Sequence, residues 1–256
     1  MHKRVSSDPR GAVLVHARRP VRNRSASVLA VAKPTAPGAK PRRLKASAAI
    51  QAAASETTAK AVAGSGAQKT LAAKRLEDLA KRIRICVKCP LHASRTVAVP
   101  GEGKASAKVM IIGEGPGKQE DQTGRPFVGN AGRYLDHVLE GTAFERADFF
   151  ITNVVKCRPP SNRTPKSNEI DTCTSLYLFE QMRLINPKLI LLLGSVAVKK
   201  MLGLKSVEEA RGRLIEHEGR KYLASYHPAV RFYREDLAQK IKQDFSLLKK
   251  ELEKLA

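Results

Sequence analysis

Three short apolar segments, separated by stretches with helical periodicity, place the strongest limit on what this chain can fold into. They read KVMIIG (108–113), FFITNVV (149–155) and LILLLG (189–194). Runs of this kind are typical of strands buried on both faces, and strands that alternate with helices pair in parallel. The sequence therefore predicts an α/β fold, a three-layer α/β/α domain with a central, mainly parallel four-stranded sheet. Helices are expected over residues 133–139, 165–184 and 195–202.

Further elements are expected on either side of these segments. Residues 213–226 read as a hairpin that leads to a last strand, and residues 234–255 read as a long amphipathic helix. Residues 71–85 also repeat apolar residues at helical spacing, so we expect a helix that covers the domain. Its apolar face is predicted to consist of Leu71, Leu76, Leu79 and Ile83.

The first 70 residues differ in composition from the rest. They contain 14 Lys and Arg against 2 Asp and Glu, and no Phe, Tyr or Trp. Such a segment cannot bury enough apolar surface to offset its ordering entropy. We therefore predict a disordered basic tail over residues 1–70 and one folded domain over residues 71–256. The Arg- and Ser-rich, acid-poor composition of the tail also fits an organellar transit peptide.

The net charge of the chain is +23, of which +12 falls on the tail and +11 on the part expected to fold. A basic surface of this kind favours a polyanion, and nucleic acid fits better than anionic lipid. No apolar run approaches the roughly 20 residues of a membrane span. The N-terminus also lacks the pattern of a secretory signal. We expect a cytoplasmic, nucleoid-associated monomer without membrane contact.

Four cysteines suggest a metal site. Cys86 and Cys89 form a CxxC pair, 67 residues separate Cys89 from Cys157, and 15 more separate Cys157 from Cys173. Structural zinc sites usually show two close pairs, and a chain that is not exported disfavours two disulfides. From spacing alone, a zinc ion and an iron-sulfur cluster both remain open, with buried free thiols as the third alternative.

Three loops follow predicted strands, and in open α/β sheets the ligand site lies at the carboxyl ends of the strands. They read GEGPGKQEDQTGRPFVGNAG (113–132), TNVVKCRPPSNRTP (152–165) and YHPAVRFYR (226–234). The glycines of the first loop would suit a phosphate cradle. However, this loop lacks the Lys-Ser/Thr of a P-loop and the spacing of a dinucleotide fingerprint.

The same three loops closely resemble the motifs of the family-4 uracil-DNA glycosylases, the iron-sulfur members of their superfamily. The likeness runs from about Leu76 to the C-terminus. It implies an enzyme that flips uracil out of DNA and hydrolyses its N-glycosidic bond in base excision repair. A sliding clamp or other repair proteins are candidate partners. The resemblance also implies a 4Fe-4S cluster held by Cys86, Cys89, Cys157 and Cys173. The alternatives are a non-catalytic iron-sulfur DNA-binding protein of the same fold and an unrelated nucleotide-binding module.

The resemblance assigns roles to residues of the three loops. Phe127 is expected to stack on the flipped uracil, Asn153 to pair with its polar edge, and His227 to donate a hydrogen bond to uracil O2. Glu114 and Glu120 are expected to position the water or to stabilise the cationic sugar.

Two further loop positions complete the predicted site. Asn162 takes a supporting role in the second loop. Gly115 occupies the position at which the best-known branch of the superfamily carries an aspartate, so one essential general base is not implied.

Overall fold

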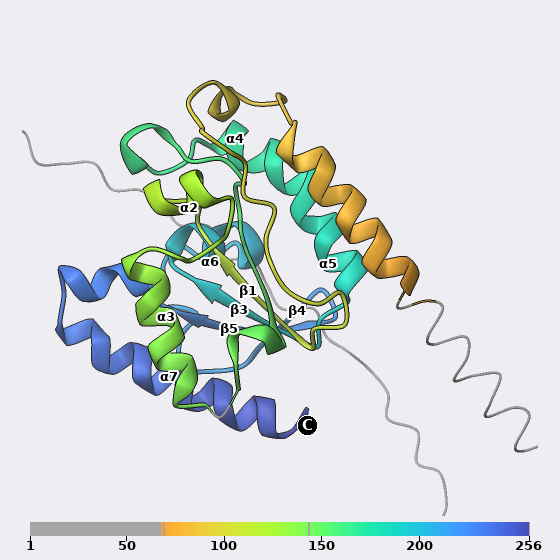
Figure 1. Ribbon diagram of the computed structural model, residues 1–256. Coiled ribbons are helices and arrows are strands. Elements are labelled where there is room, and N and C mark those ends of the chain that lie inside the picture. The colour runs from red at the N-terminus through yellow and green to blue at the C-terminus, as the bar shows by residue number, and fades with distance from the viewer. Residues whose placement is uncertain (1–67, 69, 143, 256) are drawn as a thin grey trace, which may run out of the picture. The chain divides into compact units, whose positions relative to one another are not determined.

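The computed structural model describes residue 68 and residues 70–142 and 144–255 (Figure 1). The predicted tail therefore lies almost wholly outside the described residues, and a domain boundary at residue 70 stays a prediction. A central sheet has the strand order β2-β1-β3-β5-β4. The strands are β1 (Val109–Gly113), β2 (Phe149–Asn153), β3 (Leu189–Leu193), β4 (Ile215–His217) and β5 (Arg220–Ser225).

The predicted parallel sheet is confirmed. Strands β2, β1, β3 and β5 are parallel, with Val109 of β1 opposite both Phe149 and Leu189. Every residue of β1, β2 and β3 is buried, which explains why these strands read as continuous apolar runs. The predicted hairpin adds β4 as a fifth, antiparallel strand at the edge of the four.

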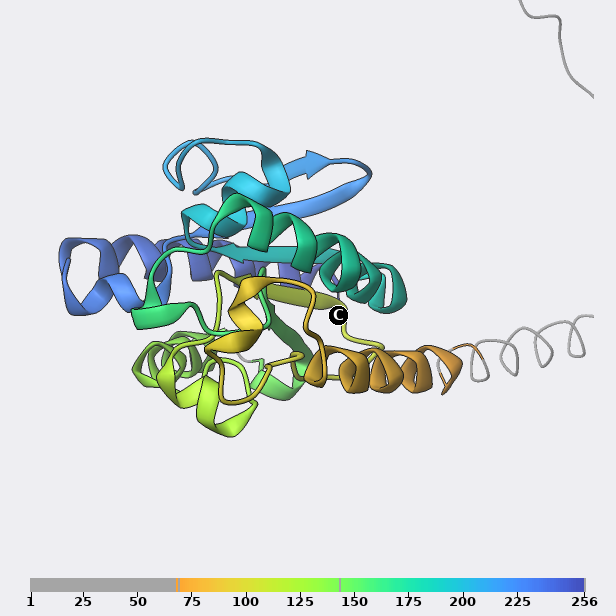
Figure 2. The same cartoon turned by 90° about the horizontal axis from the view of Figure 1, so that it is seen from above.

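Helices cover both faces of the sheet, as the layered fold requires. Helices α3 and α7 lie on one face, while α5 and α6 lie on the other (Figures 1 and 2). A π-helical turn, Thr174–Leu178, joins α4 to α5 directly after Cys173. The helices are α2 (Lys118–Thr123), α3 (Asn130–Glu140), α4 (Ser167–Cys173), α5 (Phe179–Ile185), α6 (Ser195–Leu202) and α7 (Asp236–Glu253). Short 3-10 turns are η1 (Pro90–Ala93), η2 (Arg146–Asp148), η3 (Pro160–Asn162) and η5 (Pro228–Phe232).

The helix expected near residue 71 is present over residues 70–84, but its predicted apolar face is wrong at one position. Leu76, Leu79 and Ile83 are buried, whereas Leu71 is 52% exposed. Leu76 lies five positions after Leu71. At about 100° per residue, Leu71 therefore points well away from the face that packs on the domain.

A short helix, α2, interrupts the glycine-rich loop after β1, where no helix was predicted from the sequence. Gly117 is its N-cap, and the carboxylate of Glu120 three residues later accepts a hydrogen bond from the Gly117 N–H. Gly124 ends the helix in the left-handed region, with φ of +73°. The spacing of Gly117, Glu120 and Gly124 is the local signal that could have predicted this helix.

Candidate active site

The loops after β1, β2 and β5 meet at one edge of the sheet because these strands are parallel. They surround a cavity of about 360 Å³. All seven residues that were expected to bind the base or to take part in the chemistry line this cavity. They come from all three loops. They are Glu114, Gly115, Glu120, Phe127, Asn153, Asn162 and His227. Sequence reasoning did not single out Pro116, Gly117, Ala131, Pro159, Arg163, Ala229 and Tyr233, which complete the lining.

Phe127 and Asn153 lie close together at the bottom of the cavity. Gly113 is paired with Asn153 across the sheet, and a Cβ at Gly113 would lie 2.5 Å from Asn153 Oδ1 and 2.5 Å from Phe127 Cζ. No side chain therefore fits at residue 113 while both groups hold these positions. Asn153 is 2% exposed, and its Oδ1 is buried without a hydrogen-bond partner among the residues that the structure describes. A buried acceptor without a partner is costly, so this atom is suited to a ligand N–H.

His227 contributes a neutral ring to the cavity. Its imidazole is stacked on Phe127, with ring centroids 5.5 Å apart and the planes at 29°. Burial lowers the pKa of His227 to about 4, and nearby Glu120 only partly opposes this effect. Nδ1 accepts a hydrogen bond from the Ala229 N–H at 3.3 Å. A neutral imidazole with Nδ1 as acceptor carries its proton on Nε2, which leaves one N–H donor for a ligand.

The two acidic residues of the first loop have different surroundings. The buried Glu120 carboxylate accepts three backbone hydrogen bonds, from the N–H groups of Gly117 (3.1 Å), Val128 (2.9 Å) and Gly129 (2.8 Å). Both of its oxygens are thus engaged in holding the loop. Glu114 lies partly buried in the cavity, and burial raises the pKa of its carboxyl group. Glu114 is therefore the better placed of the two to act on a ligand or a water molecule.

The second loop places Asn162 and Arg163 at the edge of the cavity. Asn162 is exposed, has φ of +56°, and its Oδ1 accepts a hydrogen bond from Arg158 Nε at 2.8 Å. Arg163 forms a two-pronged ion pair with buried Glu169, at 2.9 and 2.8 Å. These contacts order the loop. Asn162 therefore contributes to the shape of the cavity wall, consistent with a supporting role.

Tyr233, whose side chain was not predicted to matter, stands at the mouth of the cavity. It is 84% exposed, which is unusual for a large aromatic residue, and lies just past the 3-10 turn η5 that follows His227. The sequence motif YHPAVRFYR, which places aromatic residues among arginines, could have indicated that Tyr233 matters. Alternation of this kind is common where a surface meets single-stranded nucleic acid.

The four cysteines gather around one small cavity, although 86 residues of sequence lie between the first and the last of them. All four are free thiols. Burial raises the pKa values of Cys157 and Cys173, the latter to about 12. Arg95 donates from Nη1 to Cys157 Sγ at 3.1 Å, and the Lys156 N–H donates to Cys173 Sγ at 3.3 Å. Donors aimed at sulfur stabilise thiolates, the form in which cysteine binds a metal.

The chemistry of the cysteine site is that of an all-thiol metal site. Among the described residues, no three His, Cys, Asp or Glu side chains are placed to hold one metal ion. A tetrahedral zinc ion, with Zn–S bonds of about 2.3 Å, would need its sulfur atoms in direct contact with one another. Four thiols around a common cavity are a donor set that either an all-cysteine zinc site or an iron-sulfur cluster uses.

Lys156 connects the cysteine site to the cavity of the three loops. Its side chain is buried, and Nζ donates to Thr152 Oγ1 (2.6 Å), Gln181 Oε1 (2.7 Å) and the backbone carbonyl of Asn153 (2.8 Å). Burial lowers the pKa of Lys156 to about 8. Its neighbour Cys157 belongs to the cysteine site, and Asn153, whose carbonyl Lys156 binds, lines the cavity of the three loops. Lys156 therefore contacts both regions.

Comparison with known proteins agrees with this arrangement. A family model, the uracil DNA glycosylase superfamily, matches residues 100–253. The type-4 uracil-DNA glycosylase of Thermotoga maritima is 42% identical over 157 residues, which are 60% of this chain and 81% of that protein. Those of Pyrobaculum aerophilum and Archaeoglobus fulgidus are 39% and 40% identical over 183 and 179 residues. These matches cover 67% and 66% of this chain and 92% and 89% of the two relatives.

The chain therefore belongs to the uracil-DNA glycosylase superfamily. Within it, the resemblance to family 4 that its motifs predict is confirmed by the type-4 relatives. None of the helices in the described part of the chain has the length and hydropathy needed to cross a bilayer.

Proposed function

We propose that this chain is a DNA glycosylase that flips uracil out of DNA and hydrolyses its N-glycosidic bond, leaving an abasic site for base excision repair. Membership of the superfamily and about 40% identity to type-4 uracil-DNA glycosylases support this reaction. The observation that carries the proposal is the convergence of Phe127, Asn153 and His227 on one cavity. At about 360 Å³, the cavity is of a size suited to a single base.

Base recognition follows from the geometry at the bottom of the cavity. Phe127 offers a ring on which a planar base stacks. The unpartnered Oδ1 of Asn153 accepts a hydrogen bond from uracil N3–H, while Nδ2 donates to O4. Cytosine presents an acceptor at N3 and a donor at N4, the reverse of this pattern. An amide held in one orientation therefore selects uracil.

His227 stabilises the leaving base. When the bond between C1′ and N1 breaks, both of its electrons stay with the base, and the negative charge spreads from N1 to O2. The neutral imidazole donates its Nε2–H to O2 and keeps this proton. With a pKa of about 4, the imidazolium form, which could transfer a proton to the base, is scarcely populated at neutral pH. One donor aimed at a developing oxyanion in a cavity of this kind is worth about 10²- to 10³-fold in rate.

Glu114 acts on the sugar. Bond breaking leaves positive charge on C1′, which an ionised carboxylate in the cavity stabilises. A water molecule then bonds to C1′ through its oxygen and releases a proton to the Glu114 carboxylate or to solvent. Glu120 is a positioning residue in this scheme, since its carboxylate is already occupied by three backbone donors. A Cβ at Gly115 would lie 2.8 Å from Val155 Cγ2, so residue 115 presents only backbone to the cavity beside Glu114.

The cysteine site completes the proposal. Cys86, Cys89, Cys157 and Cys173 would hold a 4Fe-4S cluster, whose contribution is a structural cross-link between the N-terminal helix region and the loop after β2. The shared cavity and the donors from Arg95 and Lys156 to sulfur support this assignment.

The test is a glycosylase assay with single- and double-stranded oligonucleotides that contain one uracil. Abasic sites are converted to strand breaks with alkali and separated on a denaturing gel. We expect excision of uracil and none of cytosine or thymine at the same position. Binding of the oligonucleotides without any base release would contradict the proposal and would favour a non-catalytic DNA-binding protein.

A further inference from the structure

Phe127 adopts a backbone conformation that bulky residues rarely accept. Its φ is +50°, in the left-handed region that favours glycine. The same residue packs against the first turn of α3, where a Cβ at Gly132 would lie only 1.9 Å from the Phe127 carbonyl oxygen. Such a conformation persists only where the surrounding structure holds it in place. Some group must therefore fix the backbone beneath the stacking ring.

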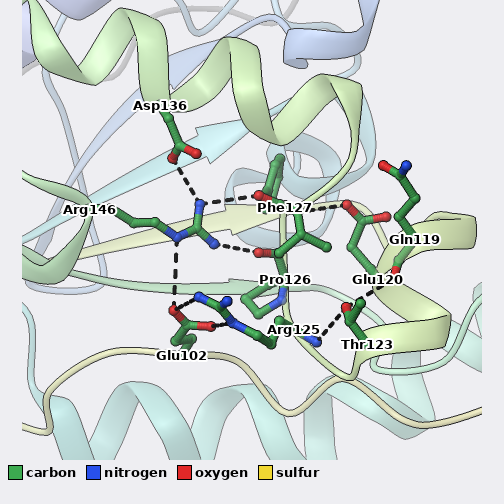
Figure 3. A network of polar contacts seen from close by, with 10 residues as sticks. Glu102, Gln119, Glu120, Thr123, Arg125, Pro126, Phe127, Asp136 and Arg146 are labelled. Atoms are coloured by element: carbon green, nitrogen blue, oxygen red, sulfur yellow. Dashed lines mark hydrogen bonds and ion pairs between the residues drawn. The ribbon is translucent and has the colours of Figure 1, made fainter.

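Arg146, in the turn η2 that precedes β2, is that group. Its guanidinium donates from Nη1 to the carbonyl of Phe127 at 3.2 Å and from Nη2 to the carbonyl of Pro126 (Figure 3). The forked guanidinium thus holds two consecutive carbonyls at once. On the other side of this segment, the N–H groups of Val128 and Gly129 donate to Glu120. The backbone around Phe127 is fixed from both directions.

Arg146 is itself held by two carboxylates. Nη1 also contacts Asp136 Oδ1 of α3 at 3.0 Å, and Nε lies 3.9 Å from Glu102 Oε1. Glu102 in turn forms a two-pronged ion pair with Arg125, at 2.8 Å for both contacts. We call Glu102, Arg125, Asp136 and Arg146 the Arg146 network. The Arg146 side chain is 22% exposed, and its partners in the network are more exposed, so the network reaches the surface. None of its four residues lines the cavity of the three loops.

We propose that Arg146 is a positioning residue for uracil excision, which acts by holding the backbone of Phe127 so that its ring forms the stacking surface for the base. This inference rests on the proposed function. Arg146 touches neither the base nor the reacting atoms, so its whole effect should pass through Phe127. A lysine could not replace it, because a single ammonium group cannot hold both carbonyls and both carboxylates in this forked geometry.

The test compares Arg146→Gln with Arg125→Gln as a matched control. Both variants remove one cation from the network, but only the first removes the donors to Pro126 and Phe127. At saturating enzyme, we expect the single-turnover excision rate of Arg146→Gln to fall by about tenfold or more, or about 1.4 kcal/mol in the barrier. Arg125→Gln should stay within about twofold of wild type, and inhibition by free uracil should weaken only in Arg146→Gln.

A double-mutant cycle decides whether Arg146 acts through Phe127. In a Phe127→Ala background, adding Arg146→Gln should change the excision rate by less than about twofold. A loss as large as in the wild-type background would overturn the proposal, as would equal rates for Arg146→Gln and wild type. Melting temperatures identify any variant that fails to fold, and Arg146→Lys, which should also excise slowly, then takes the place of Arg146→Gln. A wild-type protein that releases no uracil would instead refute the proposed function, and the role of Arg146 would fall with it.

Discussion

Replacing His227 tests the central chemical step. His227→Ala removes one neutral N–H donor and also the stack on Phe127. The donor is worth about 2.7–4 kcal/mol in the transition state, whereas an aromatic pair contributes about 0.5–1.5 kcal/mol beyond its buried area. The donor dominates, so the loss should appear in the chemical step. We expect the single-turnover rate at saturating enzyme to fall about 10²- to 10³-fold. His227→Gln, which retains an N–H donor on its amide, should recover part of this loss.

The assay uses enzyme in excess over a uracil-containing oligonucleotide, with alkaline cleavage at each time point and a series of pH values. Because the pKa of His227 is lowered to about 4, the ring is already neutral at pH 5.5 and stays neutral as the pH rises. His227 should therefore add no inflection near the usual histidine value. A loss of less than tenfold in His227→Ala would refute the reasoning. So would a wild-type inflection near pH 6.5 that disappears in His227→Gln.

Three further predictions follow from the site and the tail. Asn153→Asp should lose most activity on uracil and gain some cytosine excision, because a protonated carboxyl group can donate a hydrogen bond to cytosine N3 and accept one from the N4 amino group. Unchanged uracil excision would show that Asn153 does not belong to the site. Protein purified without oxygen should be brown with about four irons per chain, and Cys157→Ser should lose iron and melt at a lower temperature. One zinc per chain without colour would refute the cluster. Deleting residues 1–70 should leave single-turnover excision nearly unchanged but weaken DNA binding and flatten its dependence on salt, because the net charge of +12 on this segment is expected to act on phosphates. Equal salt slopes for the full-length and the shortened protein would show that the segment does not engage DNA.

The sequence predicted the sheet and the cavity well because their signals are local. Buried parallel strands read as apolar runs, and the loops that follow them fall at one edge by topology alone. The support for Phe127 could not be read in this way. Arg146, Glu102 and Asp136 are separated from it by 9 to 25 residues, and nothing in their local pattern links them to a ring in another loop. The positive φ of Phe127 was equally hidden, since the residue type argues against it.

The different surroundings of the two loop carboxylates could not be predicted from the sequence either. Glu114 and Glu120 look equivalent in the motif, six residues apart in a glycine-rich stretch. Both line the cavity, and only the fold reveals that Glu120 also receives three backbone N–H groups from its own loop. Which carboxylate the backbone N–H groups engage depends on the path of the backbone through α2, and that short helix was not predicted.

Burial acts on Glu114 and His227 in the cavity in a way that defines one working protonation state. It raises the pKa of Glu114 and lowers the pKa of His227, so both groups are shifted toward their neutral forms. The proposed chemistry needs an ionised Glu114 beside a neutral His227. As the pH falls, Glu114 takes up its proton before His227 does, because burial raises the pKa of Glu114 above its ordinary value of 4.5 and lowers that of His227 to about 4. The acid side of the rate profile therefore belongs to the carboxyl group. Glu114→Gln should therefore lower the rate and remove the acid limb of the profile. An acid limb that survives this substitution would assign the titration to another group.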